Sequence, residues 1–519
     1  MNLADLVEAM HAFAPEGARL VLRGDGETRI GDLTEDSRTA VPGSLFIARR
    51  GLTSDGRAYI VSAVESGASA VLTDADGAER VPEGTPVLVA GDPALAAAFA
   101  AEAYHRRPSS RLRCVGVTGT NGKSTVAGLL HQALNHAGVR TGLIGTVEID
   151  DGREVAPAEM TTPPAIELSR ALGVMTEHDC RGAAMEVSSH ALHQGRADAL
   201  SFAAAVFTNL TPEHLDYHGT LEAYGEAKAR LLDLLDGDGV AVLNAGDAWS
   251  RSLADRRTPG LVRLCGEGED ADWRIEIDGP TMLGCDLRLR TPIGEIAGRT
   301  ALAGAHNVMN LAQALCAADA VLEREGVGGA ERLHALTDAL PSLRAPAGRL
   351  QRVEAEGRDL PTVFIDYAHT GDALERTLRG VRELLDPGAR LWVVFGAGGE
   401  RDRAKRPVMG RIGSTFADAV VITSDNPRRE DPSAIIAEIL EGVPADARER
   451  VLVHADRARA IRAAIDGAAA GDVVVVAGKG HERTQVVAGA EGGVRSVAFD
   501  DAQQARAAMD ERAARGVRP

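Results

Sequence analysis

The chain has 519 residues, more than one hydrophobic core usually serves, so we expect roughly two to four domains. With 45% hydrophobic and 25% charged residues it has the composition of an ordinary globular protein, and its formal net charge of −18 argues against a nucleic-acid partner or an anionic membrane surface. An anionic substrate would need a locally basic cleft.

Nothing in the sequence predicts secretion or membrane insertion. The five cysteines are scattered and odd in number, which is typical of reduced thiols. Residues 1–5 carry no basic segment followed by an apolar one, so no signal peptide is expected. The longest apolar runs, such as residues 94–101, are too short to cross a bilayer. We therefore expect a cytoplasmic protein without a membrane partner. We also expect a monomer, although none of these features determines the oligomeric state.

The first predicted domain, residues 1–108, should be a small α/β domain. Apolar residues between 3 and 10 follow a helical period, and residues 70–72 form a predicted strand. Between them, Ser37 lies in an Asp-Ser-Arg triplet ahead of a Pro-Gly turn, a pattern that by itself most often marks a capped loop. The Pro-Ser-Ser stretch at residues 108–110 is interpreted as a linker.

The central predicted domain, residues 109–345, is organised around a glycine-rich loop. An apolar run at residues 112–117 leads into Thr118-Gly119-Thr120-Asn121-Gly122-Lys123-Ser124-Thr125, and a helical apolar pattern follows. The backbone of such a loop cradles polyphosphate, Lys123 adds a point charge, and Ser124 or Thr125 can hold Mg²⁺. Because valine occupies the first glycine position of the usual motif, a glycine-rich turn before an ordinary helix is the alternative. The strand, lysine and hydroxyl together favour a nucleotide site.

Two further predicted strands of this domain end in polar groups. Residues 183–187 deliver Glu186 and lead into Ser188, and residues 202–208 lead toward His214. Ligands of open α/β sheets lie at the carboxyl ends of the strands. Beside a P-loop, coordination of Mg²⁺ by Glu186 is therefore favoured over an exposed edge carboxylate.

Lys228 shares one face of a predicted helix with Tyr224, Leu231 and Leu232. This face should be buried, and buried lysines are rare unless they are paired or modified. A snorkelling stem with its amine in water is the simpler alternative. The functional interpretation is a desolvated amine that reacts with CO₂ to form a carbamate, which replaces a cation by a metal-binding anion.

From residue 346, after a second predicted linker at residues 345–349, apolar strands alternate with amphipathic helices such as residues 373–385. Strands are predicted at 363–365, 392–395, 419–422, 451–453, 473–476 and 497–499. This alternation indicates a doubly wound, largely parallel, Rossmann-like sheet. The predicted fold class is α/β with three domains: a smaller N-terminal α/β domain (1–108), a central P-loop parallel-sheet domain (109–345) and a C-terminal doubly wound domain (346–519).

Taken together, these motifs resemble those of the Mur ligases, the ATP-dependent amide ligases that build the peptidoglycan stem peptide. The resemblance spans nearly the whole chain and includes the P-loop variant Thr-Gly-Thr-Asn-Gly-Lys at residues 118–123. It implies that Ser124, Glu186 and His214 bind Mg²⁺, that Lys228 is carbamylated, and that Lys123, Lys228 and His214 are catalytic. The implied ATP contacts are Gly119, Thr120, Asn121, Gly122, Lys123, Ser124, Thr125, His306, Asn307, Arg349 and Asp366.

The resemblance also implies two substrate pockets. The UDP-muramoyl-peptide contacts would be Ser37, Thr161, Thr162, Ser188, Gln194 and Arg196. The diaminopimelate contacts would be Arg401, Asp425, Asn426, Pro427, Arg428, Gly478 and Glu482. The tetrad at residues 425–428 resembles the signature of family members that add meso-diaminopimelate and not L-lysine, and an arginine fork can grip the extra carboxylate in a bidentate manner. A solvated charged loop is the alternative.

The implied reaction is ligation of meso-diaminopimelate to the D-glutamate of UDP-N-acetylmuramoyl-L-alanyl-D-glutamate, through an acyl phosphate formed with ATP and Mg²⁺. The alternatives are an L-lysine-adding ligase, a folylpolyglutamate-type ligase, and a P-loop nucleotide switch that ligates nothing. A block of about a hundred residues before the P-loop, the size of a domain, counts against the folylpolyglutamate type.

Overall fold

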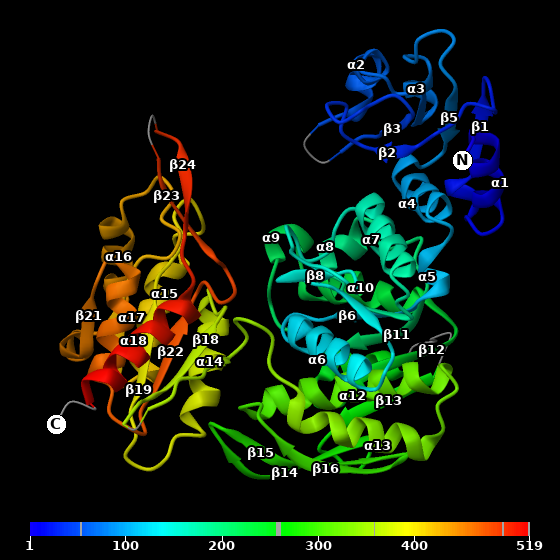
Figure 1. Ribbon diagram of the computed structural model, residues 1–519. Helices are drawn as coiled ribbons and strands as arrows, with labels where there is room; N and C mark the ends of the chain where they lie inside the picture. The colour runs from blue at the N-terminus through cyan, green and yellow to red at the C-terminus, as the bar shows by residue number, and fades with distance from the viewer. Residues whose placement is uncertain (52–53, 256–260, 358, 490–491, 517–519) are drawn as a thin grey trace. The chain divides into compact units, whose positions relative to one another are not determined.

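The computed structural model describes residues 1–51, 54–255, 261–357, 359–489 and 492–516. Contacts between residues divide the chain into two compact units (Figure 1). The first unit comprises Met1–Arg274, Arg290–Gly294 and Ala312–Leu336, and the second comprises Ile275–Leu289, Glu295–Leu311 and Thr337–Pro519. In the part of the chain that the structure describes, no helix is long and apolar enough to cross a membrane.

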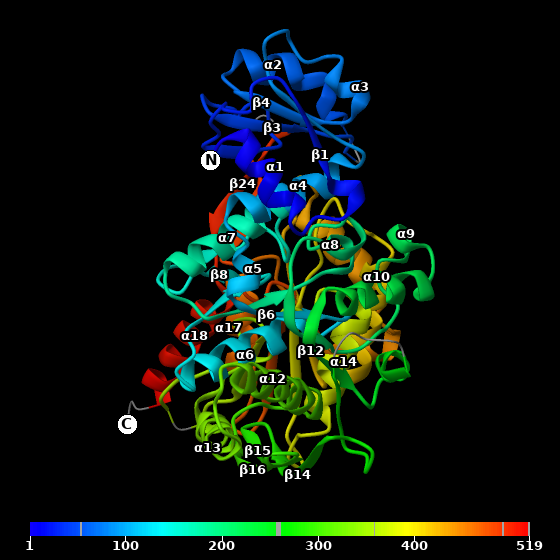
Figure 2. The same ribbon diagram turned by 90° about the vertical axis from the view of Figure 1, so that its right-hand side faces the viewer.

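The N-terminal part of the first unit is a sheet in the order β1-β5-β4-β3-β2, with helices on both faces (Figure 2). Successive residues of β3 point to opposite faces. Leu45 and Ile47 join the hydrophobic cluster of α1 and α4, whereas Phe46 and Ala48 join that of α2. The elements are α1 (Leu3–His11), β1 (Leu20–Arg23), β2 (Asp32–Thr34), β3 (Ser44–Ala48), α2 (Ile60–Glu65), β4 (Ala70–Thr73), α3 (Ala75–Ala78), β5 (Val87–Ala90) and α4 (Pro93–Tyr104).

The predicted linker at residues 108–110 is wrong. These residues begin the short helix α5 (Pro108–Arg111), in which Ser109 is buried. The backbone N–H and the hydroxyl of Ser109 both donate to Glu102 of α4, and Ser169 of α7 (Ala165–Glu177) donates to the other oxygen of that carboxyl. Burial raises the pKa of Glu102. The prolyl and seryl residues that predicted a turn instead supply a helical first turn.

A largely parallel sheet forms the centre of the first unit, in the order β14-β13-β12-β11-β6-β10-β7-β8-β9. The pairs from β14 to β7 are parallel, and β8 and β9 extend the edge antiparallel. The strands are β6 (Arg113–Thr118), β7 (Thr141–Ile144), β8 (Glu148–Asp150), β9 (Val155–Pro157), β10 (Gly182–Glu186), β11 (Phe202–Phe207), β12 (Leu235–Asn244), β13 (Leu261–Gly266) and β14 (Trp273–Thr281). The predicted strands that end before the P-loop, at Glu186 and before His214 are confirmed as β6, β10 and β11.

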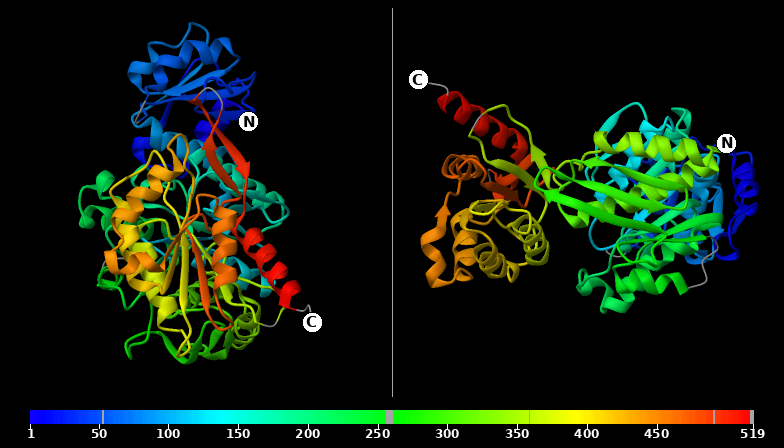
Figure 3. Two further views of the ribbon diagram at one scale, coloured as in Figure 1. Left: turned by 90° about the vertical axis from the view of Figure 1, so that its left-hand side faces the viewer. Right: turned by 90° about the horizontal axis from the view of Figure 1, so that it is seen from below.

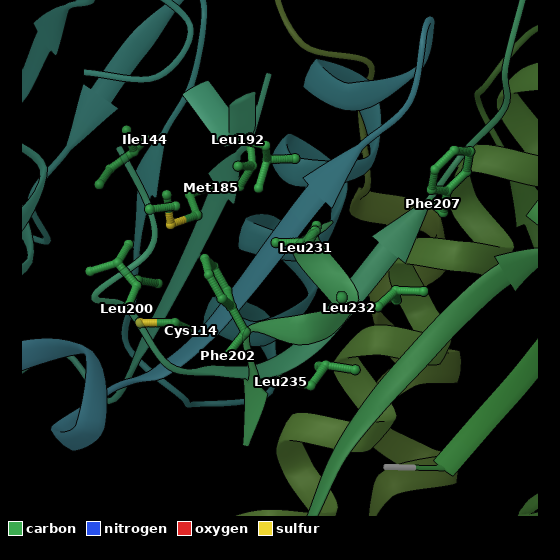
Figure 4. Close-up of a cluster of buried hydrophobic side chains, with 14 of the residues drawn as sticks. Cys114, Ile144, Met185, Leu192, Leu200, Phe202, Phe207, Leu231, Leu232 and Leu235 are labelled. Carbon is green, nitrogen blue, oxygen red and sulfur yellow. The ribbon is translucent and has the colours of Figure 1, made fainter. Parts of the chain in front are cut away.

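One face of this sheet carries a large hydrophobic cluster (Figure 4). Cys114 of β6, Met185 of β10 and Phe202 of β11 lie in it with Leu231 and Leu232 of α10. The other helices and remaining strands of the middle of the chain are α6 (Lys123–His136), α8 (Ser189–His193), α9 (Leu215–His218), α10 (Leu221–Asp233), α11 (Ala248–Ser252), β15 (Gly284–Thr291), β16 (Gly294–Thr300), α12 (Ala305–Arg324) and α13 (Gly329–Ala339). Strand ends that converge on α6 and α10 position the site described below.

The second unit contains the predicted doubly wound sheet, in the order β17-β18-β22-β19-β20-β21 (Figure 3). Its pairs are parallel except for the edge strand β17. Val393 and Phe395 of β19 pack in the cluster of α14, α15 and α16, and Trp392 and Val394 in that of α17 and α18. The elements are β17 (Gln351–Val353), β18 (Thr362–Asp366), α14 (Gly371–Arg382), β19 (Leu391–Phe395), α15 (Lys405–Phe416), β20 (Ala419–Ile422), α16 (Pro432–Glu441), β21 (Val451–Val453), α17 (Arg457–Gly467), β22 (Val473–Ala477) and α18 (Asp501–Gly516).

The strand predicted at residues 497–499 does not belong to this sheet. It overlaps β24 (Val494–Ala498), which pairs antiparallel with β23 (Thr484–Ala488) in a separate two-stranded hairpin (Figure 3). The sixth strand of the sheet is β17, which precedes β18 and closes one edge. An apolar run predicts a strand but not its hydrogen-bonding partner, which is why the sheet was assigned the wrong member.

The predicted division into three domains differs in kind from the division by contacts. The N-terminal sheet and the central sheet fall in one compact unit, and part of the segment before residue 345 falls in the other. Boundaries at residues 108 and 345 therefore stay a prediction from the sequence.

Candidate active site

The glycine-rich loop lies between β6 and α6, where the sequence predicts it. Gly119 has φ +140°, and a Cβ at this position would lie 1.9 Å from the hydroxyl of Thr208 at the end of β11, so only glycine fits. Gly122 is the residue before α6 and has φ +87°. These two glycines turn the backbone so that the loop opens onto the N-terminus of α6, the end of a helix that favours anions.

The loop is braced by the segment that follows β11. The backbone N–H of Thr120 donates to the carbonyl of Asn209 at 2.8 Å, and that of Asn121 donates to the side-chain oxygen of Asn209 at 3.1 Å. The hydroxyl of Thr120 donates to the carbonyl of Thr211 at 3.1 Å. The loop conformation is therefore fixed by protein contacts before any ligand binds, although nothing in the loop motif pointed to Asn209.

Two lysine ammonium groups converge on one carbonyl of this loop. Lys123 Nζ donates to the carbonyl of Gly119 at 3.0 Å, and Lys228 Nζ donates to the same carbonyl at 2.7 Å. Lys228 is 1% exposed, and its Nζ lies 4.3 Å from the ring centre of Tyr224. The snorkelling alternative is therefore wrong, because the ammonium is buried with its stem.

The surroundings of Lys228 favour its neutral form. Burial, and then the nearby charge of Lys123, lower the pKa of Lys228 well below 10.5, while Glu213 opposes the shift. An amine must be neutral to attack CO₂, so this environment supplies the species that carbamate formation needs. Lys228 would become a metal ligand only as the carbamate.

Glu186 and Ser124 form an oxygen-rich pair at the start of α6. Ser124 Oγ donates to Glu186 Oε2 at 2.9 Å, and the backbone N–H and hydroxyl of Thr146 donate to the same carboxylate at 2.7 and 3.1 Å. Glu186 is 1% exposed. Hard oxygen donors beside a P-loop fit Mg²⁺, which commonly takes one or two protein ligands and completes its shell with water and phosphate. Sequence reasoning missed Thr146, which lies two residues after the end of β7.

The side-chain contacts of His214 shown among the described residues are with the rings of His190 and Tyr224 and with the carboxylate of Glu213. His214 has φ +55° and its ring packs 4.8 Å from that of His190 and 6.1 Å from that of Tyr224, centre to centre. Within the described residues, no cluster of three or more His, Cys, Asp and Glu side chains is arranged to hold a metal ion. The assignment of His214 as a ligand stays a prediction.

Five of the six residues predicted to bind the sugar-peptide lie around the end of β10. Thr162 donates to the carbonyl of Glu186, and Arg196 Nη1 donates to the carbonyl of Thr162 at 2.8 Å. Arg196 also donates to Gln194 Oε1 at 2.7 Å, and Gln194 donates to the hydroxyl of Tyr217 at 3.2 Å. Thr161 and Ser188 flank this chain of hydrogen bonds: the hydroxyl of Thr161 accepts from Thr146, and Ser188 caps α8.

Ser37, the sixth of these residues, lies in the turn after β2 in the N-terminal sheet. Its two neighbours form an ion pair: the guanidinium of Arg38 donates to the carboxylate of Asp36 and lowers the pKa of that carboxyl to about 2. The structure records no hydrogen bond from Ser37 to the other five residues, all of which lie within the described ranges. Its role in substrate binding stays a prediction.

In the second unit, the four remaining predicted ATP contacts occupy the first turn of α12 and the loops around β18. Asp366 accepts hydrogen bonds from the backbone N–H of Leu350 at 2.7 Å and of Ala368 at 3.0 Å, so it joins the loop that carries Arg349 to the end of β18. The Arg349 guanidinium lies over the ring of Tyr367 at 4.9 Å. Asn307 is buried and donates to the carbonyl of Ala303, next to His306, whose ring faces α14 at Gly380.

All seven residues predicted to bind the amino acid lie in loops that follow β19, β20 and β22 of the second unit. Asn426 Nδ2 donates to Glu482 Oε2 at 2.7 Å, and Gly478, with φ +114°, leaves room for Asp425, whose Oδ2 would lie 2.6 Å from a Cβ there. Parallel strands bring their carboxyl ends to the same edge, so these loops meet there.

The two arginines of this group lie together. A Cβ on Gly398 would lie 3.2 Å from Arg428 Nη1 and 3.6 Å from Arg401 Cγ. Arg428 has φ +54°, its backbone N–H donates to the carbonyl of Val486, and its Nη1 donates to the carbonyl of Gly399 at 2.7 Å. Within the tetrad, Arg428 therefore contacts the loop after β19, and Asn426 contacts Glu482 in the loop after β22.

Sequence reasoning missed the residues that hold these loops. Arg406, 0% exposed, donates to Glu430, Glu438 and the carbonyl of Gly398. Gln485 of β23 donates to the carbonyl of Asp425 at 2.6 Å. Arg406 lies in a Lys-Arg-Pro motif that the sequence does display, whereas Gln485 lies on a hairpin whose packing the sequence does not reveal.

A glycine-rich loop that opens onto a helix, a buried oxygen pair beside it and basic loops at the ends of parallel strands define a P-loop ATP-utilising α/β enzyme. Residues 29–106 match the catalytic domain of the Mur ligase family, residues 117–318 the Mur ligase middle domain, and residues 348–480 the glutamate ligase domain of Mur ligases. The chain belongs to the Mur ligase family.

Individual relatives match along nearly their whole length. The chain is 41% identical over 504 residues to a UDP-N-acetylmuramoyl-L-alanyl-D-glutamate–2,6-diaminopimelate ligase of Chlorobaculum tepidum, covering 94% of each protein. It is 42% identical over 514 residues to the ligase of the same name from Streptomyces coelicolor, covering 98% of this chain and 96% of that one. A solved structure of a protein with that name aligns with a TM-score of 0.68 and 32% identity over 99% of both chains.

Proposed function

We propose that the protein is an ATP-dependent ligase that joins meso-diaminopimelate to the D-glutamate of UDP-N-acetylmuramoyl-L-alanyl-D-glutamate. One observation carries the choice of acceptor: Arg428 and Arg401 both lie against Gly398, in loops at the same edge of the sheet as those that carry the acidic residues Asp425 and Glu482. Meso-diaminopimelate has an ammonium and a carboxylate at its distal end, whereas L-lysine has only the ammonium. A pocket that offers both charges suits the former.

We assign the nucleotide to the P-loop and the metal to the oxygen pair beside it. Residues 119–125 would hold the phosphates, with Lys123 as their cation, and His306, Asn307, Arg349 and Asp366 of the second unit are assigned to adenine, ribose and phosphate. Glu186, Ser124 and carbamylated Lys228 would hold Mg²⁺, with His214 as a further ligand. When bound, Mg²⁺ supplies positive charge to the γ-phosphate as negative charge builds up there.

In the first step the γ-carboxylate of D-glutamate attacks the γ-phosphorus of ATP, the bond to the β–γ bridging oxygen breaks, and ADP leaves. In the second step the amine of meso-diaminopimelate attacks the acyl carbon, phosphate leaves and the amine loses a proton. Lys123 would balance the charge of the phosphates. Thr162, Gln194 and Arg196 would orient the sugar-linked dipeptide, with Ser37, Thr161 and Ser188 as further contacts.

We further propose three domains with boundaries at residues 108 and 345, a monomeric state and a cytoplasmic location. Support for the location comes from the five cysteines, all of which are buried free thiols.

The test is release of phosphate from ATP by the purified protein with each substrate left out in turn. We expect turnover only when the UDP-muramoyl-dipeptide and meso-diaminopimelate are both present, and L-lysine should replace the acceptor poorly. Equal turnover with L-lysine would contradict the acceptor assignment. Turnover with neither substrate would indicate a plain nucleotide hydrolase, and turnover with a folate and glutamate would indicate the folylpolyglutamate type.

A further inference from the structure

Lysine is rare in this chain and is confined to buried or half-buried positions. Only four of the 57 lysines and arginines are lysines, namely Lys123, Lys228, Lys405 and Lys479, and none of the four is exposed. A lysine ammonium is a compact point charge with three rotatable donors, whereas an arginine guanidinium is a planar fork with a fixed donor geometry. All the other lysine-or-arginine positions of this chain hold arginine. We therefore take each lysine to mark a site where the ammonium itself is needed. Lys123 and Lys228 lie at the P-loop, and Lys405 and Lys479 belong to the second unit.

Lys479 is the more deeply buried of these two. It is 0% exposed and follows β22 in the loop that also carries Gly478 and Glu482. Its Nζ donates to Glu482 Oε2 at 2.7 Å and to Asn426 Oδ1 at 3.1 Å. Burying an ammonium costs a great deal of free energy unless it is paired and hydrogen-bonded, and Lys479 is both. Both of its partners belong to the proposed acceptor pocket.

Lys479 determines which way the amide of Asn426 faces. The side-chain oxygen of Asn426 accepts from Lys479 Nζ and from the backbone N–H of Val486 at 2.9 Å, and both of these groups can only donate. The amide nitrogen must therefore point the other way, where it donates to Glu482 Oε2 at 2.7 Å. Oε2 of Glu482 is thereby held by two donors. Among the described residues the structure records no hydrogen bond to its other oxygen, Oε1.

We propose that Lys479 is a positioning residue of the acceptor pocket. It orients the amide of Asn426 and the carboxylate of Glu482 so that Glu482 Oε1 is presented to the ammonium of the amino-acid acceptor. Lys479 acts through these two side chains and does not itself touch the acceptor. The inference rests on the proposed function, because it takes meso-diaminopimelate as the ligand of this pocket.

The test is Lys479→Met, which keeps the length of the side chain and removes its charge and donors. Without the ammonium the amide of Asn426 keeps one donor, and Glu482 can rotate. We expect the KM for meso-diaminopimelate to rise at least about tenfold, while kcat and the KM values for ATP and the UDP-muramoyl-dipeptide change less than about threefold. A purely structural role would change all of these constants together.

Two further variants make the result decisive. In a Glu482→Gln background, adding Lys479→Met should raise the acceptor KM by less than about threefold, because the carboxylate through which Lys479 acts is already gone. The matched control is Ile461→Ala, at a buried position of α17, which should lower the melting temperature but leave the acceptor KM unchanged. An unchanged acceptor KM in Lys479→Met, or effects that multiply in the double variant, would overturn the inference.

Turnover by the wild-type enzyme distinguishes a failure of this inference from a failure of the proposed function. If the wild-type enzyme shows no turnover with meso-diaminopimelate, the proposed function fails. If it turns over normally and Lys479→Met retains the same acceptor KM, only the role of Lys479 fails.

Discussion

The two fully buried lysines of this protein lie in opposite electrostatic surroundings. Lys228, in the first unit, meets a carbonyl, an aromatic ring and a second ammonium, and its pKa is lowered by burial and by Lys123. Lys479, in the second unit, meets a carboxylate and an amide oxygen. Equal burial therefore says little about the role of a lysine. The charge of its neighbours separates an amine suited to chemical modification from a fixed cation that orients other groups.

The largest effect is expected from Lys228→Ala. If the carbamate of Lys228 supplies a negative ligand at the metal, its removal should lower kcat by about 10³-fold or more, the scale on which a preorganised electrostatic contact acts. Added acetate or formate should restore part of the activity in Lys228→Ala by entering the space of the carbamate. The same carboxylates should not restore Lys479→Met, which lacks a cation. Full activity of Lys228→Ala would show that the reaction does not need a carbamate at this position.

The next effect concerns the acid that should share the metal with that carbamate. Glu186→Gln keeps the size of the side chain but removes its charge, so the Mg²⁺ concentration for half-maximal rate should rise about 10- to 100-fold. The measurement is a Mg²⁺ titration of initial rates at saturating ATP. As a matched control, Glu102→Gln alters another buried glutamate of the first unit, away from the P-loop, and should leave this titration unchanged. A normal titration in Glu186→Gln would contradict its assignment as a ligand.

A smaller and more selective effect is expected at Arg428. Loss of a charge-assisted hydrogen bond costs about 1.5–3 kcal/mol, so Arg428→Met should lower kcat/KM for meso-diaminopimelate about 10- to 100-fold. The rate with L-lysine should hardly change, since L-lysine lacks the distal carboxylate. Arg429→Met, on the exposed neighbour, is the control. An equal loss for both acceptors would show that Arg428 supports the loop through Gly399 and does not recognise the acceptor.

The sequence predicts the parts of this molecule that obey local rules. Uninterrupted apolar strands identified β6, β10, β11 and the parallel strands of the second unit, because strands buried on both faces need apolar residues throughout. The helical phase of Lys228 predicted its burial, since residues three and four apart share a helix face. The end of each strand then placed Glu186 and Asp425 at a carboxyl edge.

The contacts that depend on tertiary structure could not be read in the same way. Ser109 lies in a Pro-Ser-Ser stretch interpreted as a linker, yet it is a buried residue of the short helix α5 and donates two hydrogen bonds to Glu102. Gln485 and Lys479 have no local pattern that distinguishes them from surface residues. Gln485 donates to Asp425 and Lys479 donates to Asn426, 60 and 53 positions away in the chain, so only the folded sheet brings these two pairs together.

The smallest expected effect is on stability, and it tests the surroundings of Lys228 directly. In the unfolded chain Lys228 should keep its proton up to about pH 10.5. In the folded protein its pKa is lowered, so the proton is lost at a lower pH. Between these two pKa values the unfolded state binds more protons than the folded state. The free energy of unfolding of the wild-type protein should therefore rise with pH relative to that of Lys228→Met. Below that window the difference should be constant, with the wild-type protein bearing the cost of a buried charge. Denaturant titrations of the two proteins in CO₂-free buffer measure this difference. A difference between the wild-type protein and Lys228→Met that stays flat up to pH 10.5 would mean that Lys228 is charged in the folded protein and cannot be the reactive amine.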